Sequence, residues 1–405
     1  MTANIYNIAS GVTLYAGCAA VAPPPASGTP VVRPAPGTFA NVSLNTLNSV
    51  APAGWPTGDS GGPFANWTGA VLAKDYSTRG AMVNHGSGHL SEGTSLWAGV
   101  NIFDFDTSRW VMSNVPSQPI IQRYPEINAY VDLHGESLVP ATLGHTTPPH
   151  TYDGVIYRRA STGKPKGSML RLSFAGAAYT SSAHEFDISS PTAPPVRVID
   201  ALGGNNSYPM AALNEAETGF WYLTGNGTGP MRFYDFTTYT STVISGADFN
   251  EYGNYSMSLI PGARTCLVAT GNSGSGGVDM GVYVCPLIGG VPSTWTKITP
   301  TGTPPSDKRC GSVWSTILNC MVSYEAAGSN NVHRLTPPAT GSLTTGTWAW
   351  TFETLTGVGG ILPARTQSVA DNGAWGRFIE APALGCFIWV DSINGPVQAW
   401  TLQGM

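Results

Sequence analysis

The eight residues "LGCFIWVD" at 384–391 belong to a pattern that recurs along this chain. Each copy is a short apolar and aromatic run with little charge, which is typical of a buried β-strand. The other copies are "TGFWYLTG" (218–225), "RTCLVATG" (264–271) and "LNCMVSYE" (318–325). In the alignment one position holds Phe220, Cys266, Cys320 and Cys386, at spacings of 46, 54 and 66 residues. A strand repeated at this period predicts one repeated structural unit.

Two further strands accompany this pattern. The strand before it is expected to be the innermost of its unit and reads "TRGAMV" (78–83), "TYDGVIY" (151–157), "SYPMAAL" (207–213), "NYSMSLI" (254–260), "KRCGSVW" (308–314) and "WGRFIEA" (375–381). The last strand carries an aromatic residue after Ser or Thr, as in "TSRWVM" (107–112), "PSTWTKI" (292–298) and "GTWAWTFETL" (346–355). Six units result, starting near residues 67, 148, 206, 253, 307 and 365. Units of about four strands predict the blades of a β-propeller.

The last unit reaches the C-terminus before its fourth strand. "GTFANVSLNTL" (37–47) has the same Gly-Thr-aromatic opening as "GTWAW", so we expect this N-terminal strand to complete the last blade. Such an exchange closes the ring and protects strand edges. The sequence therefore predicts an all-β fold, a six-bladed β-propeller of four-stranded blades, with seven blades as the alternative count.

Composition agrees with this fold and excludes some functions. The 405 residues include 49 Gly and 32 Pro, and only 11% are charged, which favours short strands joined by tight turns. The net charge is −5 and there is no basic run, so nucleic acid is not an expected partner. No apolar stretch is long enough to predict insertion into a membrane.

Residues 1–36 precede the repeat and are predicted to form an extended, Pro-rich docking arm, with the propeller spanning 37–405. Residues 11–22 are apolar like a signal-peptide core. The first basic residue, however, is Arg33, so the positive region that a secretory signal needs is missing. We expect no secretory signal.

Two stretches carry a family resemblance. "HLSEGTSLWAGVNIFDFDTSRW" (89–110) and "NGAWGRFIEAPALGCFIWVDSINGPVQAWTL" (372–402) resemble the kelch-like, galactose-oxidase-type propellers of bacteria and bacteriophages. The resemblance implies the propeller scaffold over roughly residues 37–405. It does not imply the copper oxidase, because the oxidase draws a histidine from a domain after the propeller and the last histidine here is His333. No cofactor is therefore expected.

The hexapeptide "GDSGGP" at 58–63 matches the segment around the nucleophilic serine of trypsin-like proteases. A serine nucleophile needs a base and an orienting carboxylate. In those proteases both partners come far upstream, yet here no His precedes His85 and no acid precedes Asp59. Ser60 is therefore interpreted as part of a Gly-rich turn that enters the first blade, and the chain as a non-enzyme.

Other chemical candidates are weaker. His85 and His89 have the spacing of a zinc pair, but "HGSGH" does not favour a helix, and residues four apart on a strand are ~13 Å apart. His145 and His150 flank "TTPP", and His89 with His150 is a weak metal candidate, so no metal is predicted. Asp104, Asp106 and Glu136 are the carboxylates available for glycoside hydrolysis, but a turn-capping role for Asp106 is preferred.

The best ligand candidate comes from the aligned inner strands. One position there holds Arg79, Tyr152, Tyr208, Tyr255 and Arg309, and Arg377 is nearly in register with them. A shared position on inner strands predicts a ring at one mouth of the channel, where Tyr and Arg suit a sugar or an acidic group. The alternative, favoured about two to one, is that these side chains bond neighbouring blades and fill the channel.

Cys266, Cys320 and Cys386, at the repeated position, are interpreted as buried apolar residues. Whether Cys266 bonds to Cys285, or Cys310 to Cys320, is left open by the sequence.

Three functions follow. The first is a non-enzymatic virion protein of a bacteriophage, as a decoration, tail or adhesin subunit, bound to other virion proteins through residues 1–36. The second is a secreted or cell-surface propeller that binds or oxidises carbohydrate, with a glycan as ligand. The third is an intracellular kelch-type interaction scaffold.

Overall fold

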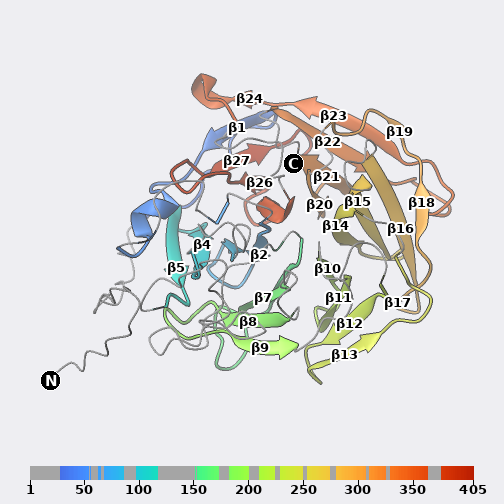
Figure 1. The fold of residues 1–405 in the computed structure, drawn as a ribbon. Helices are drawn as coiled ribbons and strands as arrows, with labels where there is room; N and C mark the ends of the chain where they lie inside the picture. Colours follow the sequence, from blue (N-terminus) through green and yellow to red (C-terminus); the bar gives the residue numbers. More distant parts are fainter. Residues whose placement is uncertain are drawn as a thin grey trace, which may run out of the picture.

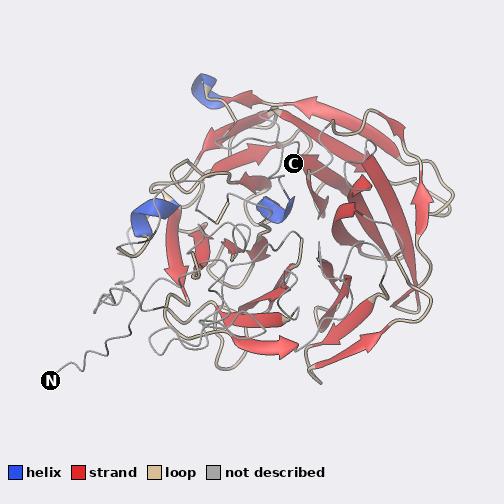
Figure 2. Ribbon diagram, in the orientation of Figure 1, coloured by secondary structure: helices blue, strands red, loops and turns tan. Residues whose placement is uncertain are grey.

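A computed structural model describes residues 28–53, 55, 63–64, 68–85, 97–116, 151, 153–172, 182–199, 209–223, 229–249, 253–273, 280–306, 310–324, 329–363 and 375–405. Over these residues the strands form six small, mainly antiparallel sheets arranged around a central axis (Figures 1 and 2). The predicted six-bladed, all-β propeller is confirmed. No helix in the described ranges is long and apolar enough to cross a membrane.

Each blade is one sheet, numbered from its inner strand outward. Blade 1 contains β2 (Val71–Ala73), β3 (Ala81–Asn84), β4 (Val100–Asp104) and β5 (Arg109–Ser113), and blade 2 contains β6 (Val155–Arg158), β7 (Ser168–Leu172), β8 (Ala183–Asp187) and β9 (Val196–Ile199). Blade 3 contains β10 (Met210–Leu213), β11 (Gly219–Leu223), β12 (Arg232–Asp235) and β13 (Thr240–Val243).

The remaining blades carry short additional strands. Blade 4 contains β14 (Gly253–Ile260), β15 (Cys266–Ser273) and β16 (Met280–Ile288), with β17 (Val291–Pro292) and β18 (Thr296–Ile298) both paired to β16. Blade 5 contains β20 (Gly311–Ser315), β21 (Cys320–Tyr324), β22 (Asn331–Thr336) and β23 (Ala349–Thr354), with β19 (Thr301–Gly302) added at its edge.

Blade 6 joins the two ends of the chain. Its inner strands are β25 (Phe378–Ala381), β26 (Cys386–Trp389) and β27 (Gln398–Thr401), and its fourth strand is β1 (Thr38–Asn41). β1 pairs antiparallel with β27, and Phe39 faces Trp400 with ring centroids 4.2 Å apart (Figure 1). The predicted closure by an N-terminal strand is confirmed, and β24 (Thr356–Gly357) protects the outer edge of β1.

The repeated position behaves as the alignment predicts. Phe220, Cys266, Cys320 and Cys386 each pair with the last residue of the inner strand beside them, and all four are buried. None of the five cysteines in the described part of the chain forms a disulfide. Burial raises the pKa of Cys266 and of Cys386 to about 12, which agrees with a packing role.

The predicted inner strand of blade 1 is wrong. "TRGAMV" (78–83) leads into β3, the second strand, whereas the inner strand is the three-residue β2. β2 is only three residues long, so its sequence pattern is weak and the next strand was aligned in its place. The six inner strands β2, β6, β10, β14, β20 and β25 contact one another in turn and close a ring around the channel.

Part of the predicted arm belongs to the propeller surface. Val31 is buried, and its backbone N–H donates to Phe105 O at 2.8 Å. The Arg33 guanidinium donates to Met405 O at 2.6 Å. Residues 28–33 are thereby fixed to blade 1 and to the C-terminus, and residues 1–27 lie outside the described residues.

Candidate functional site

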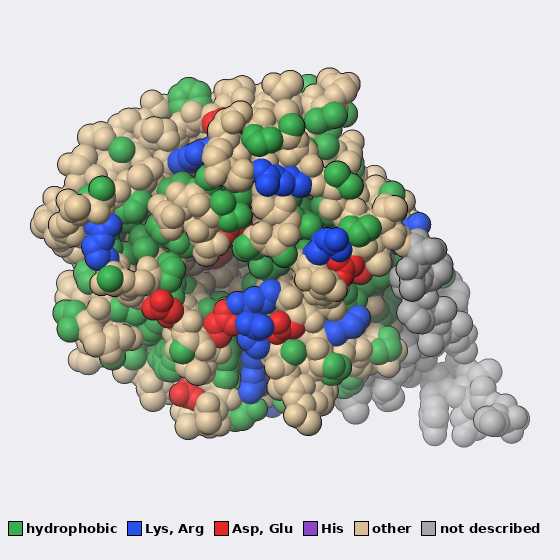
Figure 3. Space-filling model, turned by 180° about the vertical axis from the view of Figure 1, so that it is seen from behind, with side chains coloured by type: hydrophobic (Ala, Val, Ile, Leu, Met, Phe, Trp, Pro, Cys, Tyr) green, Lys and Arg blue, Asp and Glu red, His purple; other side chains and the backbone are tan. Residues whose placement is uncertain are grey.

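A cavity of about 440 Å³ occupies the central channel, and residues of all six inner strands line it. Most of the wall is apolar, with Leu72, Ile156, Leu213, Leu259, Val313 and Ile379 among the contributors. Cavities of this size hold small molecules in many proteins. Seen from behind, the molecule is hollowed at its centre, and acidic and basic side chains gather beside the hollow (Figure 3).

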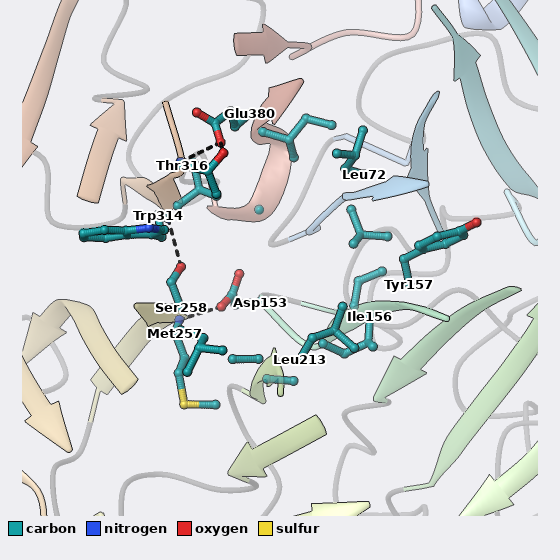
Figure 4. Close-up of a pocket in the computed structure, with 18 of the residues that line it drawn as sticks. Leu72, Asp153, Ile156, Tyr157, Leu213, Met257, Ser258, Trp314, Thr316 and Glu380 are labelled. Carbon is teal, nitrogen blue, oxygen red and sulfur yellow. Dashed lines mark hydrogen bonds between the residues drawn. The ribbon is translucent and has the colours of Figure 1, made fainter. Parts of the chain in front are cut away.

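Asp153 lines this channel and forms a hydrogen bond that crosses between blades. It precedes β6 of blade 2, yet its Oδ2 accepts a hydrogen bond from the Met257 backbone N–H of blade 4 at 2.7 Å. An ideal Cβ placed on Gly376, just before β25 of blade 6, would lie 3.5 Å from Asp153 Oδ1. The carboxyl group therefore lies between three blades, near the channel axis (Figure 4).

The local sequence explains this position. Gly154 lets the backbone approach blade 3, because a Cβ there would be 2.9 Å from the Pro209 ring. The Gly154 N–H donates to Thr151 O at 2.7 Å, and the Thr151 hydroxyl accepts from Gly69 N–H of blade 1 at 2.8 Å. The Asp-Gly pair thus forms a tight turn that directs the carboxyl inward.

Asp153 is partly exposed, and it lines the cavity. Protein atoms surround the rest of the side chain. Burial raises the pKa of Asp153 well above its usual range, and the single hydrogen bond from Met257 only partly opposes this effect. Burial at this point of the channel therefore disfavours the ionised form of the carboxyl group.

Glu380 is the second carboxyl in the wall, but its role is different. It lies on β25 and accepts hydrogen bonds from the Ser315 hydroxyl and from Thr316 N and Oγ1, at 2.9 and 3.0 Å for the latter two (Figure 4). These donors belong to the turn between β20 and β21. Glu380 therefore joins blade 6 to blade 5, and its oxygens are occupied.

A charged cluster lies at the rim of the cavity and joins three blades. Lys74 pairs with Glu217, which also accepts from Arg159 at 3.3 Å. Arg159 in turn holds Asp75 through two bonds, of 2.6 and 2.7 Å. The bidentate Arg159 bond lowers the pKa of Asp75, so this carboxyl stays ionised.

The structure does not assemble the predicted Arg/Tyr ring from its described members. Arg79 lies in the turn between β2 and β3, the end of blade 1 opposite the predicted mouth, and pairs with Asp106 at 2.7 Å. Tyr255 packs in the core against Phe249 and Tyr283, with centroids 5.2 and 5.5 Å apart. Tyr152, Tyr208 and Arg309 lie outside the described residues.

Arg377 is also buried rather than directed into the channel. It pairs with Asp391 at 2.9 Å, donates to Phe64 O at 3.1 Å and lies over the Trp389 ring. A shared sequence position therefore did not mean a shared direction, because residues just before a strand can point between blades as easily as into the channel.

The other sequence candidates have structural roles or lie outside the description. His85 is buried, with Nε2 3.0 Å from Ala98 O and Nδ1 2.9 Å from Arg171. His89, Glu136, His145, His150 and Ser60 lie outside the described residues. Among described residues, no group of three or more His, Cys, Asp or Glu side chains could hold a metal ion.

The carboxylates of the "FDFDTSRW" stretch cap turns, and Asp104 rather than Asp106 caps the turn at Thr107. Asp104 accepts from Asp106 N–H at 3.1 Å and from the Thr107 hydroxyl at 2.9 Å, whereas Asp106 holds the neighbouring turn through Thr78 N–H at 2.7 Å. Asp187 and Asp235 cap the same turn in blades 2 and 3. The recurring signal was visible as an aromatic-Asp pair at the end of the third strand in blades 1 to 3.

Comparison with known proteins identifies no family for this chain. No family model and no curated protein matches the chain. Among solved structures it is similar to a Bacteroides thetaiotaomicron VPI-5482 protein of unknown function, with a TM-score of 0.43 and 8% identity over 90% of this chain and 75% of that one. An auxiliary nutrient binding protein from Bacteroides ovatus ATCC 8483 gives a TM-score of 0.47 and 12% identity, over 83% and 69% of the two chains.

A bifunctional GH43-CE protein from Bacteroides eggerthii gives a TM-score of 0.38 and 13% identity, over 74% of this chain and 35% of that one. Propellers of unrelated activities share this arrangement of strands, so these similarities do not identify what the chain binds. The resemblance to kelch-like propellers stays a prediction.

Proposed function

We propose that this chain is a non-enzymatic binding protein that takes a small ligand into its central cavity. The observation that carries the proposal is a cavity of about 440 Å³, lined by all six blades, into which one carboxyl group faces. An apolar wall with a few convergent polar groups is the usual composition of a small-molecule site.

A thermal-shift screen tests this function. The library contains amines, carboxylic acids, sugars and nucleosides, and each hit is repeated with Leu213→Trp, which fills the cavity from β10. We expect at least one class to raise the melting temperature of the wild type and to lose this effect in Leu213→Trp. Val243→Trp, on the exposed strand β13, is the matched control and should keep the effect. A screen in which every shift survives Leu213→Trp would contradict the proposal.

We further propose that the protein is an assembly subunit, with a bacteriophage virion as the favoured location. Residues 28–33 are fixed to the propeller, while residues 1–27 contain no charged side chain and are rich in apolar residues. An uncharged segment next to a fixed anchor is suited to docking on another protein.

The docking proposal is tested by deleting residues 1–27, because this deletion keeps the contacts of Val31 and Arg33. The shortened chain is expected to melt at the same temperature as the full chain but to be lost from purified particles. Val32→Ala, at an exposed position, is the control for changes beside the anchor. Normal incorporation of the shortened chain would rule out docking through this segment.

A further inference from the structure

Within the proposed function, the chemistry of the cavity wall restricts which ligand fits. The titratable side chains of the described wall are one phenol, one amine and four carboxyl groups, namely Tyr157, Lys74, Asp153, Glu215, Glu217 and Glu380. Lys74 is paired with Glu217, and Glu380 is occupied by blade 5. The charge of the wall therefore favours a cation.

Asp153 is the wall carboxyl that a ligand in the centre of the channel meets. Its Oδ2 is held by Met257 N–H, and its Oδ1 faces the space in front of Gly376. The apolar side chains of Leu72, Ile156 and Leu213 lie around the same space (Figure 4). A carboxylate in such surroundings gains most from a ligand that brings its own positive charge.

We infer that the cavity binds an organic ammonium ion with a compact apolar body, whose N–H groups donate to Asp153. This inference rests on the proposed small-ligand function and specifies its ligand class. When the ammonium ion enters, Asp153 gives its proton to solvent and the carboxylate pairs with the ligand. The reaction takes up one cation and releases one proton, so charge and atoms balance.

Glu215 at the rim adds to the attraction without competing for the inner position. Its Oε1 accepts from Gly262 N–H at 3.1 Å, on the turn after β14. The ammonium ion therefore passes Glu215 and reaches the inner carboxyl, while its apolar body replaces water along the wall.

The experiment compares cyclohexylammonium with cyclohexanol, which have the same ring and differ in charge. Titration calorimetry in two buffers of different ionisation enthalpy measures affinity and the number of protons released. We expect cyclohexylammonium to bind about tenfold or more tightly than cyclohexanol, with release of up to one proton at neutral pH.

Asp153→Asn keeps the acceptor for Met257 N–H but cannot ionise. It is expected to bind both probes equally and to release no proton. Asp248→Asn, at an exposed position outside the cavity, should behave as the wild type. Circular dichroism melting confirms that each variant is folded.

Equal binding of the two probes, or unchanged preference and proton release in Asp153→Asn, would overturn the ammonium inference and leave the cavity function standing. If neither probe binds, the ammonium inference fails, and the wider screen with Leu213→Trp decides the cavity function separately.

Discussion

At the scale of single residues, Glu380 shows how a buried carboxylate is used to join blades. Its oxygens accept several hydrogen bonds from one turn of blade 5, so the charge is compensated by donors rather than by a cation. Buried donors are costly to leave unpaired, which makes this side chain a strong determinant of stability.

We predict that Glu380→Ala lowers the free energy of unfolding by about 2 kcal/mol or more, because Ser315 and Thr316 lose their acceptor. Urea unfolding followed by tryptophan fluorescence measures the change. Glu380→Gln keeps one acceptor oxygen and should lose less. Asp248→Ala, at an exposed site, should change stability by less than about 0.5 kcal/mol, and a Glu380→Ala effect of that size would be contrary to the proposed role.

The cysteines provide a second residue-scale prediction. Burial raises the pKa of Cys285 to about 12 and of Cys320 to about 11, so few thiolates exist at neutral pH. We expect no more than one of the six thiols to react with a disulfide reagent in the native protein, and all six in denaturant. Cys18, outside the described residues, is the one for which no burial is claimed. Rapid native reaction of two or more thiols would contradict the buried positions.

At the scale of elements, β1 is the strand that turns six sheets into a closed ring. Phe39 is buried against Trp400 on one side of this strand, and its neighbours pair in register with β27. The sequence predicted this closure because the last repeat lacked a strand and the N-terminal segment had the missing pattern. The repeat of the strand pattern along the sequence was a stronger predictor of the propeller than the β-propensity of any single strand.

The closure predicts a large effect for one substitution. Phe39→Ala should destabilise the protein by about 3–5 kcal/mol, because it leaves a cavity beside Trp400 and weakens the joint between the chain ends. Thermal and urea unfolding measure this loss. Val32→Ala, 76% exposed in the same N-terminal segment, is the matched control and should be near neutral. Similar stabilities of the two variants would mean that β1 does not close the ring.

Alignment of the repeats did not predict the channel-lining residues correctly, and the reason is geometric. Alignment identified the inner-strand position but not the direction of its side chains, so Tyr255 and Arg377 were placed in the channel although both pack between elements. In blade 1 the inner strand is only three residues long, which moved Arg79 to the wrong end. Asp153 was passed over, although the Asp-Gly pair at the start of β6 was a readable turn signal.

At the scale of the whole molecule, the inner strands of the six blades surround a central channel, and their side chains leave a cavity in it. The charged cluster of Lys74, Asp75, Arg159 and Glu217 ties blades 1 to 3 at the rim, and Asp153 ties blades 2 and 4 at the centre. The rim carboxylate Asp75 is favoured ionised, whereas Asp153 is favoured neutral. The two sites therefore give the stability of the protein opposite dependences on pH.

The sign of this dependence follows from the pKa shifts. Asp75 has a lowered pKa in the folded state, so its contribution is present above the unfolded value and is lost as the pH falls. Asp153 has a raised pKa, so the folded state holds its proton more tightly. Its contribution is full below the unfolded value of 3.8 and declines as the pH rises toward the folded pKa.

Asp153→Asn removes this decline and keeps the bond from Met257 N–H. We therefore predict that the variant is more stable than the wild type at pH 7, because the wild-type folded state must either keep a proton that the unfolded state has released or bury a charge. The difference should shrink as the pH falls toward the unfolded value of 3.8. Urea unfolding of both proteins between pH 3.5 and about 8 measures it, within the range where they remain folded. A variant that is less stable than the wild type at neutral pH would show that ionised Asp153 stabilises the propeller without a ligand. That result would contradict the proposal that Asp153 ionises only when a cationic ligand binds.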